Sequence, residues 1–486
     1  MMFSPESGQL DQFNNKLEFT PTIGSNNFSE KGDELINISN DNIIYGEEEF
    51  NLNSSRSSLD ESNKSYCGIK GNSILSGILN ICASSVGAGC FTFPWIIYSL
   101  GILNSTIIYL ITTISIYYSL DLLRSFVVDT KYFSFSLMTE TTLGKKWLMI
   151  YNISSFIYYL SIDINYLSLI YSIFKSTLIS HSTFIGFNFL LITCSIEILL
   201  CLFTSETYKI NFLSLITMFS YAFIVLTTFF EGIRSSIRYK YFTEKFSQKH
   251  FFIPLEKNGL KVFFEIITAC IKYIYAYSYH CSFPTLIGNL KNVNDSNSKK
   301  VHNISFIIIA STYFFIGIFG YLIRDPVSTV LFREYEDSDE RDYFTLFIKI
   351  ILFFFLFSLI PIRYIVVRDG YIALIGKEKF TYKKDLLITS LGLIFMNGFV
   401  FMNEELFVEE GNIEIDIFSI MVYIFGGLFG VIISFGLPVI NYAAVNGKRK
   451  IKSLIGYGIT GIFLVVGLLS FGYSFNEMFM TKEDDE

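Results

Sequence analysis

Long apolar runs separated by short polar segments fill the chain from about residue 70 to about residue 475. A helix needs roughly 20 mainly apolar residues to cross a bilayer. Sliding hydropathy predicts about 11 runs of this length, with boundaries good to a few residues. The predicted spans cover residues 72–100, 102–125, 147–176, 184–204, 208–231, 262–289, 302–323, 343–367, 385–402, 415–443 and 451–474. The pattern therefore predicts an all-α integral membrane protein.

The two ends of the chain lack this pattern. Residues 1–70 are rich in Asn, Ser, Glu and Gly, a composition that cannot bury a core, so we expect a disordered tail. Residues 71–475 form the predicted transmembrane domain, and residues 476–486 form a short acidic tail. No apolar stretch follows Met1, so we expect no cleavable signal peptide and insertion directed by the first span.

Composition and short motifs narrow the function classes. Charged residues make up 17% of the chain, against about 25% in soluble domains, and the net charge of −7 does not suggest a nucleic-acid partner. The seven cysteines include no CxxC pair, so we expect neither a disulfide nor a metal site. The sequence contains no phosphate-binding loop and no GxSxG motif. We therefore expect no enzyme and no cofactor, with membrane lipids around the helices.

Basic residues in short loops predict the orientation, because cytoplasmic loops carry an excess of Lys and Arg. The segments after spans 2 and 6, the end of span 8 with Arg363 and Arg368, and the segment before span 11 are basic. These segments share one side of the membrane, and acidic loops lie on the other. The longer loop after span 5 is also basic and breaks the pattern. We expect a cytoplasmic N-terminus.

The first span carries a run of small residues in its middle. The run is Ser84, Ser85, Val86, Gly87, Ala88 and Gly89, and Pro94 follows it. Glycine weakens a helix interior, and proline removes a ladder hydrogen bond. Inside a bilayer the freed backbone groups must find partners other than lipid. The segment therefore either packs closely against another helix or opens its backbone onto a polar ligand.

The sixth span is interrupted by polar residues and a proline, from Ser278 to Pro284. Matched broken helices five spans apart are typical of secondary transporters built from inverted repeats, with the substrate near the midplane between the breaks. Spans 1–5 and 6–10 form the predicted repeats, and span 11 is appended. Either break alone also suits ordinary helix packing, in which small residues and proline kinks are common.

Short motifs spread in order over residues 71–443 resemble one family. The motifs are Asn80, Val86 to Gly89 and Pro94 in span 1, Tyr279-His280, Pro284 and Leu290-Lys291 in span 6, Asn303-Ile304-Ser305, Tyr313 and Phe319 to Leu322 in span 7, Pro361-Ile362-Arg363 in span 8, and Phe435 to Pro438 in span 10. They resemble the amino acid/polyamine/auxin permease family, which includes neutral and proton-coupled amino-acid transporters. The resemblance implies an amino-acid transporter with about 11 transmembrane helices, a LeuT-type 5+5 inverted repeat with broken helices 1 and 6 plus one extra helix.

Three positions depart from the sodium-coupled branch of that family. Ala83 stands where Asn is frequent in span 1, and Leu352 and Phe354 stand where span 8 usually offers a hydroxyl. A sodium ion needs oxygen ligands, which apolar side chains do not supply. We therefore expect proton coupling or facilitated diffusion.

The residues of the two interruptions and one hydroxyl in span 8 are the candidate substrate-binding residues. They are Ser84, Ser85, Val86, Gly87, Ala88, Gly89, Tyr277, Ser278, Tyr279, His280 and Ser358. The carboxylate of an amino acid is expected to face free N–H groups at the broken helix ends, because these groups and the helix dipole favour negative charge.

Ionisable residues inside membrane spans are costly to bury and mark candidate proton-coupling sites. The candidates are His280, Asp163 in span 3 and Glu265 in span 6. Imidazole adds a specific reason for His280, because its charge changes near neutral pH. Glu197 in span 4 is a further buried acid. For each of these residues the alternative is a purely structural role, such as a hydrogen bond to a neighbouring span.

The sequence thus predicts secondary active or facilitative transport of an amino acid by alternating access, with protons as the candidate partner in a symport. A membrane receptor that senses an amino acid and signals through its N-terminal tail is the alternative. Either protein is expected in the plasma membrane or in an internal, vacuolar or lysosome-like membrane.

Overall fold

The structure is a computed structural model, and it describes the helical part of the chain in separate stretches. These stretches are residues 72–177, 183–203, 207–239, 259–277, 279–323, 327, 330–331, 343–375, 382–402, 421–447 and 450–480. All of them belong to the second of two compact units, Met1–Glu61 and Ser62–Glu486. The predicted N-terminal tail and the acidic C-terminal residues 481–486 lie outside the described residues.

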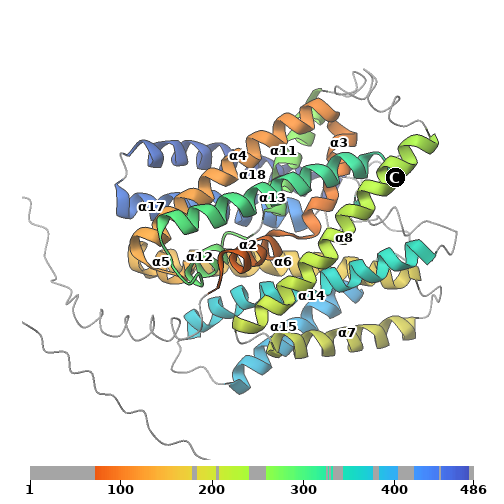
Figure 1. Ribbon diagram of the computed structural model, residues 1–486, viewed down its shortest axis with the longest axis horizontal. Helices are drawn as coiled ribbons and strands as arrows, with labels where there is room; N and C mark the ends of the chain where they lie inside the picture. The colour runs from red at the N-terminus through yellow and green to blue at the C-terminus, as the bar shows by residue number, and fades with distance from the viewer. Residues whose placement is uncertain are drawn as a thin grey trace, which may run out of the picture. The chain divides into compact units, whose positions relative to one another are not determined.

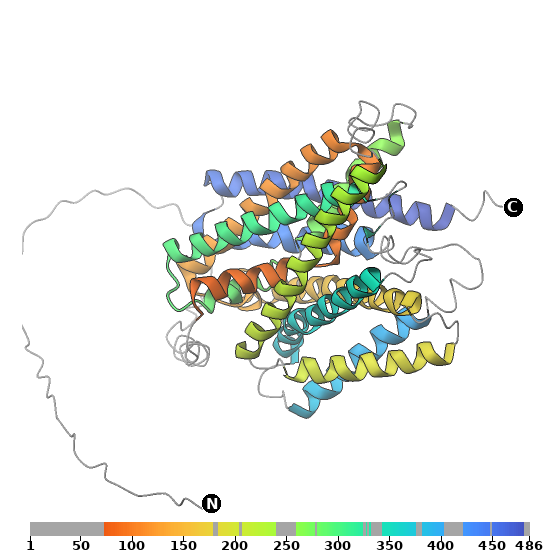
Figure 2. The same cartoon turned by 45° about the vertical axis from the view of Figure 1, so that its right-hand side comes forward.

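The described residues form helices throughout their length, apart from short turns and one isolated β-bridge (Figures 1 and 2). In chain order they are α2 (Ile74–Ser85), η1 (Ala88–Thr92), α3 (Phe93–Leu100), α4 (Ile102–Thr130), α5 (Phe135–Leu143), α6 (Lys145–Thr177), α7 (Thr183–Phe203), α8 (Thr207–Tyr239), α11 (Gly259–Ala276), α12 (Phe283–Gly288), α13 (Asp295–Tyr321), α14 (Tyr343–Ile375), α15 (Tyr382–Met402), η5 (Met421–Gly430), η6 (Ile432–Gly436), α17 (Leu437–Asn446) and α18 (Ile451–Met480). The prediction of an all-helical protein is confirmed for these residues.

Seven helices among the described residues are long and apolar enough to cross a membrane, or eight with the bent pair formed by Ile74–Ser85 and Ala88–Leu100. The multi-pass membrane character is therefore confirmed, whereas the number of about 11 spans stays a prediction. Helices also occupy the other predicted spans. Helices α7 and α15 are 21 residues long, and α11 carries Lys261, Glu265 and Lys272, which lower its hydropathy.

The helices differ in how deeply they lie in the bundle. The span of α6 is 78% buried, whereas that of α18 is only 28% buried. On one side of the bundle α15 lies against α7, and on the other side α18 packs on η5 (Figure 1). Helix α14 contacts both α6 and α8, and α13 contacts both halves of the first broken span, α2 and α3. The first broken span thus packs against α8, α13 and α14, whereas the helix α11 of the second broken span packs mainly against α4, α18 and η5.

A short backbone bridge joins the start of the first broken span to the end of the second broken span. The Asn72 N–H donates to the Asn289 carbonyl at 2.8 Å, and the Lys291 N–H donates to the Asn72 carbonyl at 3.0 Å. These bonds satisfy backbone groups just before α2 and just after α12. The beginning of the first span and the end of the sixth span are therefore fixed to each other at this point.

Arg124, near the end of α4, forms an ion pair with Asp295 at the start of α13. Its Nε lies 2.9 Å from Asp121 Oδ1, and its Nη1 lies 2.5 Å from Asp295 Oδ1. Arg124 itself is 5% exposed, so its stem is packed inside the bundle while Asp295 faces solvent.

We expect Asp295→Asn to lower the free energy of unfolding by only about 0–1 kcal/mol, because an ion pair with an exposed partner is well screened. Arg124→Ala is expected to cost about 1–3 kcal/mol, because it also removes buried side-chain packing. Thermal unfolding of the detergent-purified protein measures both. Equal shifts for the two variants would contradict this account.

One sequence interpretation is wrong. The basic flank assigned to the end of span 8 includes Arg363, but α14 continues to Ile375 with Pro361 inside it. Arg363 is 2% exposed, so it is a buried cation and contributes nothing to the loop charge. The cytoplasmic position of the N-terminus, which was argued from several basic loops, stays a prediction.

Candidate functional site

The first predicted interruption is present. Helix α2 ends at Ser85, and Val86 and Gly87 have extended backbones, with φ −61° and ψ 129° at Val86 and φ −158° and ψ 176° at Gly87. The chain then resumes in η1, and the two halves are bent by 54°. Carbonyls at the end of α2 and N–H groups at the start of η1 are consequently released from the helical ladder.

The second predicted interruption is also present, and it begins slightly earlier than the sequence indicates. Helix α11 ends at Ala276, and α12 begins at Phe283 with Pro284 in its first turn. Tyr277 is buried between these helices, and Ser278 lies outside the described residues. Because proline needs no N–H partner in a first turn, Pro284 suits the restart of the helix.

The two breaks lie against each other, and one tyrosine joins them. A Cβ on Gly89 would lie 2.9 Å from the Ala276 Cα, so only glycine allows this approach. The Tyr313 hydroxyl, from α13, lies 2.9 Å from the Ser85 carbonyl and 3.0 Å from the Ala276 carbonyl. The hydroxyl of Tyr313 is therefore within hydrogen-bond distance of the last carbonyl of α2 and of the last carbonyl of α11.

A buried cation and a second tyrosine face the first break. A Cβ on Gly87 would overlap the Tyr166 hydroxyl and would lie 2.8 Å from Arg363 Nη2. The Arg363 guanidinium carbon lies 5.1 Å from the centre of the Tyr166 ring, a cation–π arrangement. The extended backbone at Gly87 is thus in contact with a positive charge from α14 and a hydroxyl from α6.

The predicted proton-coupling residues do not gather at one place. His280 is 1% exposed at the second break, and its ring is within electrostatic range of His302 on α13. Asp163 on α6 is 3% exposed and interacts with Arg363 instead. Glu265 is only partly buried, and it lies about three turns, or roughly 17 Å, before the end of α11.

Ser358 binds a neighbouring helix rather than either break. Its hydroxyl lies 2.8 Å from the Thr217 hydroxyl on α8 and donates to the Phe355 carbonyl on its own helix. A small apolar cluster lies near the same junction, where Ala83 packs with Leu213 and Ile362. At the meeting point of α2, α8 and α14, Ala83 therefore packs against hydrocarbon, while α8 and α14 are also joined by the hydroxyl pair.

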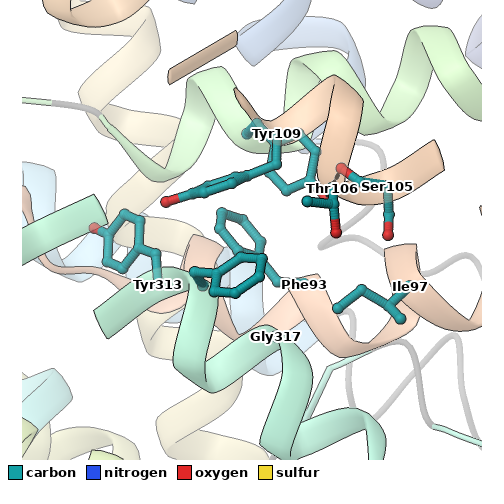
Figure 3. Close-up of a pocket in the computed structure, with 9 residues that line it drawn as sticks. Phe93, Ile97, Ser105, Thr106, Tyr109, Tyr313 and Gly317 are labelled. Carbon is teal, nitrogen blue, oxygen red and sulfur yellow. Dashed lines mark hydrogen bonds between the residues drawn. The ribbon is translucent and has the colours of Figure 1, made fainter. Parts of the chain in front are cut away.

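A pocket that includes Tyr313 in its lining is found among the described residues (Figure 3). It is lined by Phe93, Ile97, Ser105, Thr106, Tyr109, Tyr273, Tyr313, Phe314 and Gly317. Figure 3 shows the rings of Phe93, Tyr109 and Tyr313 at one end and Ser105 and Ile97 at the other. The Ser105 and Thr106 hydroxyls bond carbonyls of the preceding turn at 2.7 Å, so the lining has few free polar groups. None of the predicted substrate-binding residues lines this pocket.

Tyr166, Tyr313 and Arg363 lie at the breaks but were not among the predicted site residues. Tyrosine is abundant, with 31 copies in the chain, so no single one stood out. Arg363 is grouped in the sequence with Arg368 as a flanking charge at the end of span 8. Its position within an otherwise apolar helix that continues past it is the signal that could have found it.

Comparison with known proteins identifies the family. The family described as transmembrane amino acid transporter protein matches residues 70–480. The chain belongs to this family. The assignment agrees with the resemblance to amino-acid permeases that the sequence motifs carry.

Solved structures of two transporters share the fold. The manganese transporter of Eremococcus coleocola, in complex with an aromatic bis-isothiourea substituted compound, matches with a TM-score of 0.54 and 14% identity over 87% of this chain and 89% of that chain. A Na+-coupled sialic acid symporter in its substrate-bound outward-open state matches with a TM-score of 0.51 and 12% identity over 84% and 92%. Membership in the family and this shared fold support membrane transport as the role of the chain.

Proposed function

We propose that this transmembrane amino acid transporter protein carries amino acids by sodium-independent alternating access. The observation that carries the proposal is the contact between the two broken spans, where Tyr313 bonds the last carbonyls of both half-helices. A site of this kind exposes backbone polar groups inside the bilayer, which is tolerated where they line a cavity or bind a ligand.

The proposed architecture has 11 transmembrane helices in a LeuT-type 5+5 inverted repeat with a cytoplasmic N-terminus. The span formed by α2, η1 and α3 corresponds to the first helix, and the span formed by α11 and α12 corresponds to the sixth. Helix α18 is the appended eleventh helix. The low burial of the α18 span, 28%, supports a position outside the repeats.

The proposed recognition of the substrate follows from the charges at the first break. The substrate carboxylate faces Gly87 and the Arg363 guanidinium, since arginine binds carboxylates through paired N–H groups. The backbone from Ser84 to Gly89 and the segment from Tyr277 to His280 line the site, and Ser358 stabilises the adjoining α8–α14 interface. Rocking of one helix group against the other then exposes the site to each side in turn.

Replacement of sodium by choline is expected to leave uptake unchanged. Ala83 packs in an apolar cluster with Leu213, Ile362 and Met218, and hydrocarbon offers no oxygen ligand for a sodium ion. Uptake of a radiolabelled amino-acid panel into proteoliposomes that contain the full chain measures this. Loss of uptake in choline would overturn the sodium independence, and failure to move any amino acid in either direction would overturn the proposed function.

A further inference from the structure

Three buried ionisable side chains from different helices are linked by electrostatic interactions through the middle one, Asp163. They are Asp163 on α6, Glu197 on α7 and Arg363 on α14, with exposed fractions of 3%, 0% and 2%. We call these residues the buried triad. Asp163 interacts electrostatically with Arg363, and Glu197 interacts with Asp163.

The hydrogen bonds of the triad carboxyl groups are incomplete. Glu197 Oε2 accepts a bond from the Asn397 side chain on α15 at 2.9 Å. Within the described part of the chain, Glu197 Oε1 and Asp163 Oδ1 have no hydrogen-bond partner. Each of these buried oxygens can therefore be protonated without loss of a hydrogen bond.

The charges of the triad do not balance unless one carboxyl group is protonated. Arginine stays charged in proteins, so Arg363 neutralises one carboxylate. A second buried carboxylate would be uncompensated, at a cost of several kcal/mol. Glu197 is the acid left over, because Asp163 is the one that interacts with Arg363.

Among the described residues, the groups that interact with Glu197 include no cation. Helix α15 contributes the neutral amide of Asn397, and α6 contributes the like charge of Asp163. Among the described residues, the phenols of Tyr158, Tyr159 and Tyr166 also interact with Arg363. Neither Lys349 of α14 nor Lys272, which lies over the Tyr423 ring 5.3 Å from its centre, is among the described groups that interact with Glu197.

We propose that Glu197 binds the proton that is coupled to transport, and that Asp163 links it to Arg363 at the first helix break. The proposal rests on the proposed transport function. With Glu197 protonated, Asp163 pairs with Arg363 undisturbed. When Glu197 releases the proton, its charge repels Asp163, and the position of Arg363 against Gly87 and Tyr166 changes with it. Binding and release of the proton thus change the charge of Glu197, and this change alters the position of Arg363 at the substrate site.

An infrared measurement tests the proton site without any substrate. The full chain in detergent or lipid is titrated, and the C=O band of a protonated carboxylic acid is followed. We expect a band that disappears as the pH rises and that is missing in Glu197→Gln. Persistence of the full band in Glu197→Gln would overturn the assignment. Because no transport is needed, this result is independent of the proposed function.

A transport measurement tests the coupling. In proteoliposomes with a pH gradient, wild-type protein is expected to accumulate substrate, up to about tenfold per pH unit for one proton per substrate. Glu197→Gln is expected to lose accumulation and to show a flat pH profile, while exchange of substrate at equal pH stays measurable. Glu197→Asp, which keeps the carboxyl group, is expected to restore part of the accumulation.

The control variant is Glu231→Gln, at the end of α8, where the acid pairs with Arg234 at 3.2 Å outside the triad. It is expected to behave as wild type. Accumulation by Glu197→Gln equal to that of Glu231→Gln would overturn the coupling role of Glu197. If the wild-type protein moves no amino acid, the transport proposal fails, and the infrared band still decides whether Glu197 holds a proton.

Discussion

Replacing Gly87 by leucine is expected to abolish amino-acid uptake while the protein still reaches the membrane. The backbone at Gly87 has φ −158°, an extended conformation that any residue adopts, so the effect comes from the side chain and not from backbone strain. A Cβ alone would overlap the Tyr166 hydroxyl and lie 2.8 Å from Arg363 Nη2. Leucine would fill the space beside the cation and displace it, and overpacking of this kind costs about 1–3 kcal/mol.

A series of variants separates blockage of the site from general damage. Gly87→Ala is expected to reduce uptake, and Gly87→Leu is expected to bring it to background. The matched control is Gly461→Leu, because Gly461 is an exposed glycine of α18 with open space around its Cα. Surface labelling measures the amount of each variant in the membrane. Normal uptake by Gly87→Leu would rule out the first break as the substrate site.

Both helix breaks could be predicted because their causes are local. Gly87 and Gly89 weaken the helix of the first span. Pro284 has no N–H group and clashes with a preceding helical turn, so it interrupts the helix of the sixth span. These effects depend on the backbone of the residue itself and need no knowledge of its neighbours. Hydropathy likewise located the helices, since a run of apolar residues in a membrane protein has few alternatives to a helix.

The contacts across the breaks could not be predicted in the same way. Tyr313 is separated from Ser85 by 228 positions in the sequence, and nothing local distinguishes it from the other tyrosines. Which face of a helix meets which partner depends on packing angles that a single sequence does not contain. The family motifs include Tyr313, but they do not indicate what its hydroxyl bonds.

The error about Arg363 has a physical cause of its own. On the sequence alone, Arg363 is counted with Arg368 among the basic residues at the end of span 8, and Arg363 follows Pro361, which removes one hydrogen bond from a helix. Here α14 continues through Pro361, because neighbouring helices can stabilise the freed backbone groups. A cation that seemed to face the cytoplasm is therefore buried beside Gly87. Because Arg363 is buried there, Asp163, Glu197 and Arg363 become stronger candidates for proton coupling than His280.

Tyr313→Phe is expected to reduce the maximal rate of uptake by about tenfold or more. The variant keeps the ring, and so its packing on Phe93 at 5.6 Å and on Tyr277 at 5.1 Å between ring centres. It removes the only donor that the structure records at the carbonyls of Ser85 and Ala276 among the side chains of the described residues. A buried acceptor left without a donor costs about 1–3 kcal/mol, and 1.4 kcal/mol corresponds to about a factor of ten.

The transport kinetics of Tyr313→Phe show whether the Tyr313 hydroxyl acts during transport or only stabilises the fold. Tyr117→Phe is the matched control, because the Tyr117 hydroxyl also reaches α13, where it donates to the Asn303 side chain at 2.9 Å, but it touches neither break. Both variants are expected to reach the membrane in wild-type amounts. Only Tyr313→Phe is expected to slow transport, since its carbonyls must exchange partners whenever the two broken spans move relative to each other. Equal rates for the two variants would mean that the contact between the breaks is static packing, and that the substrate is bound elsewhere in the bundle.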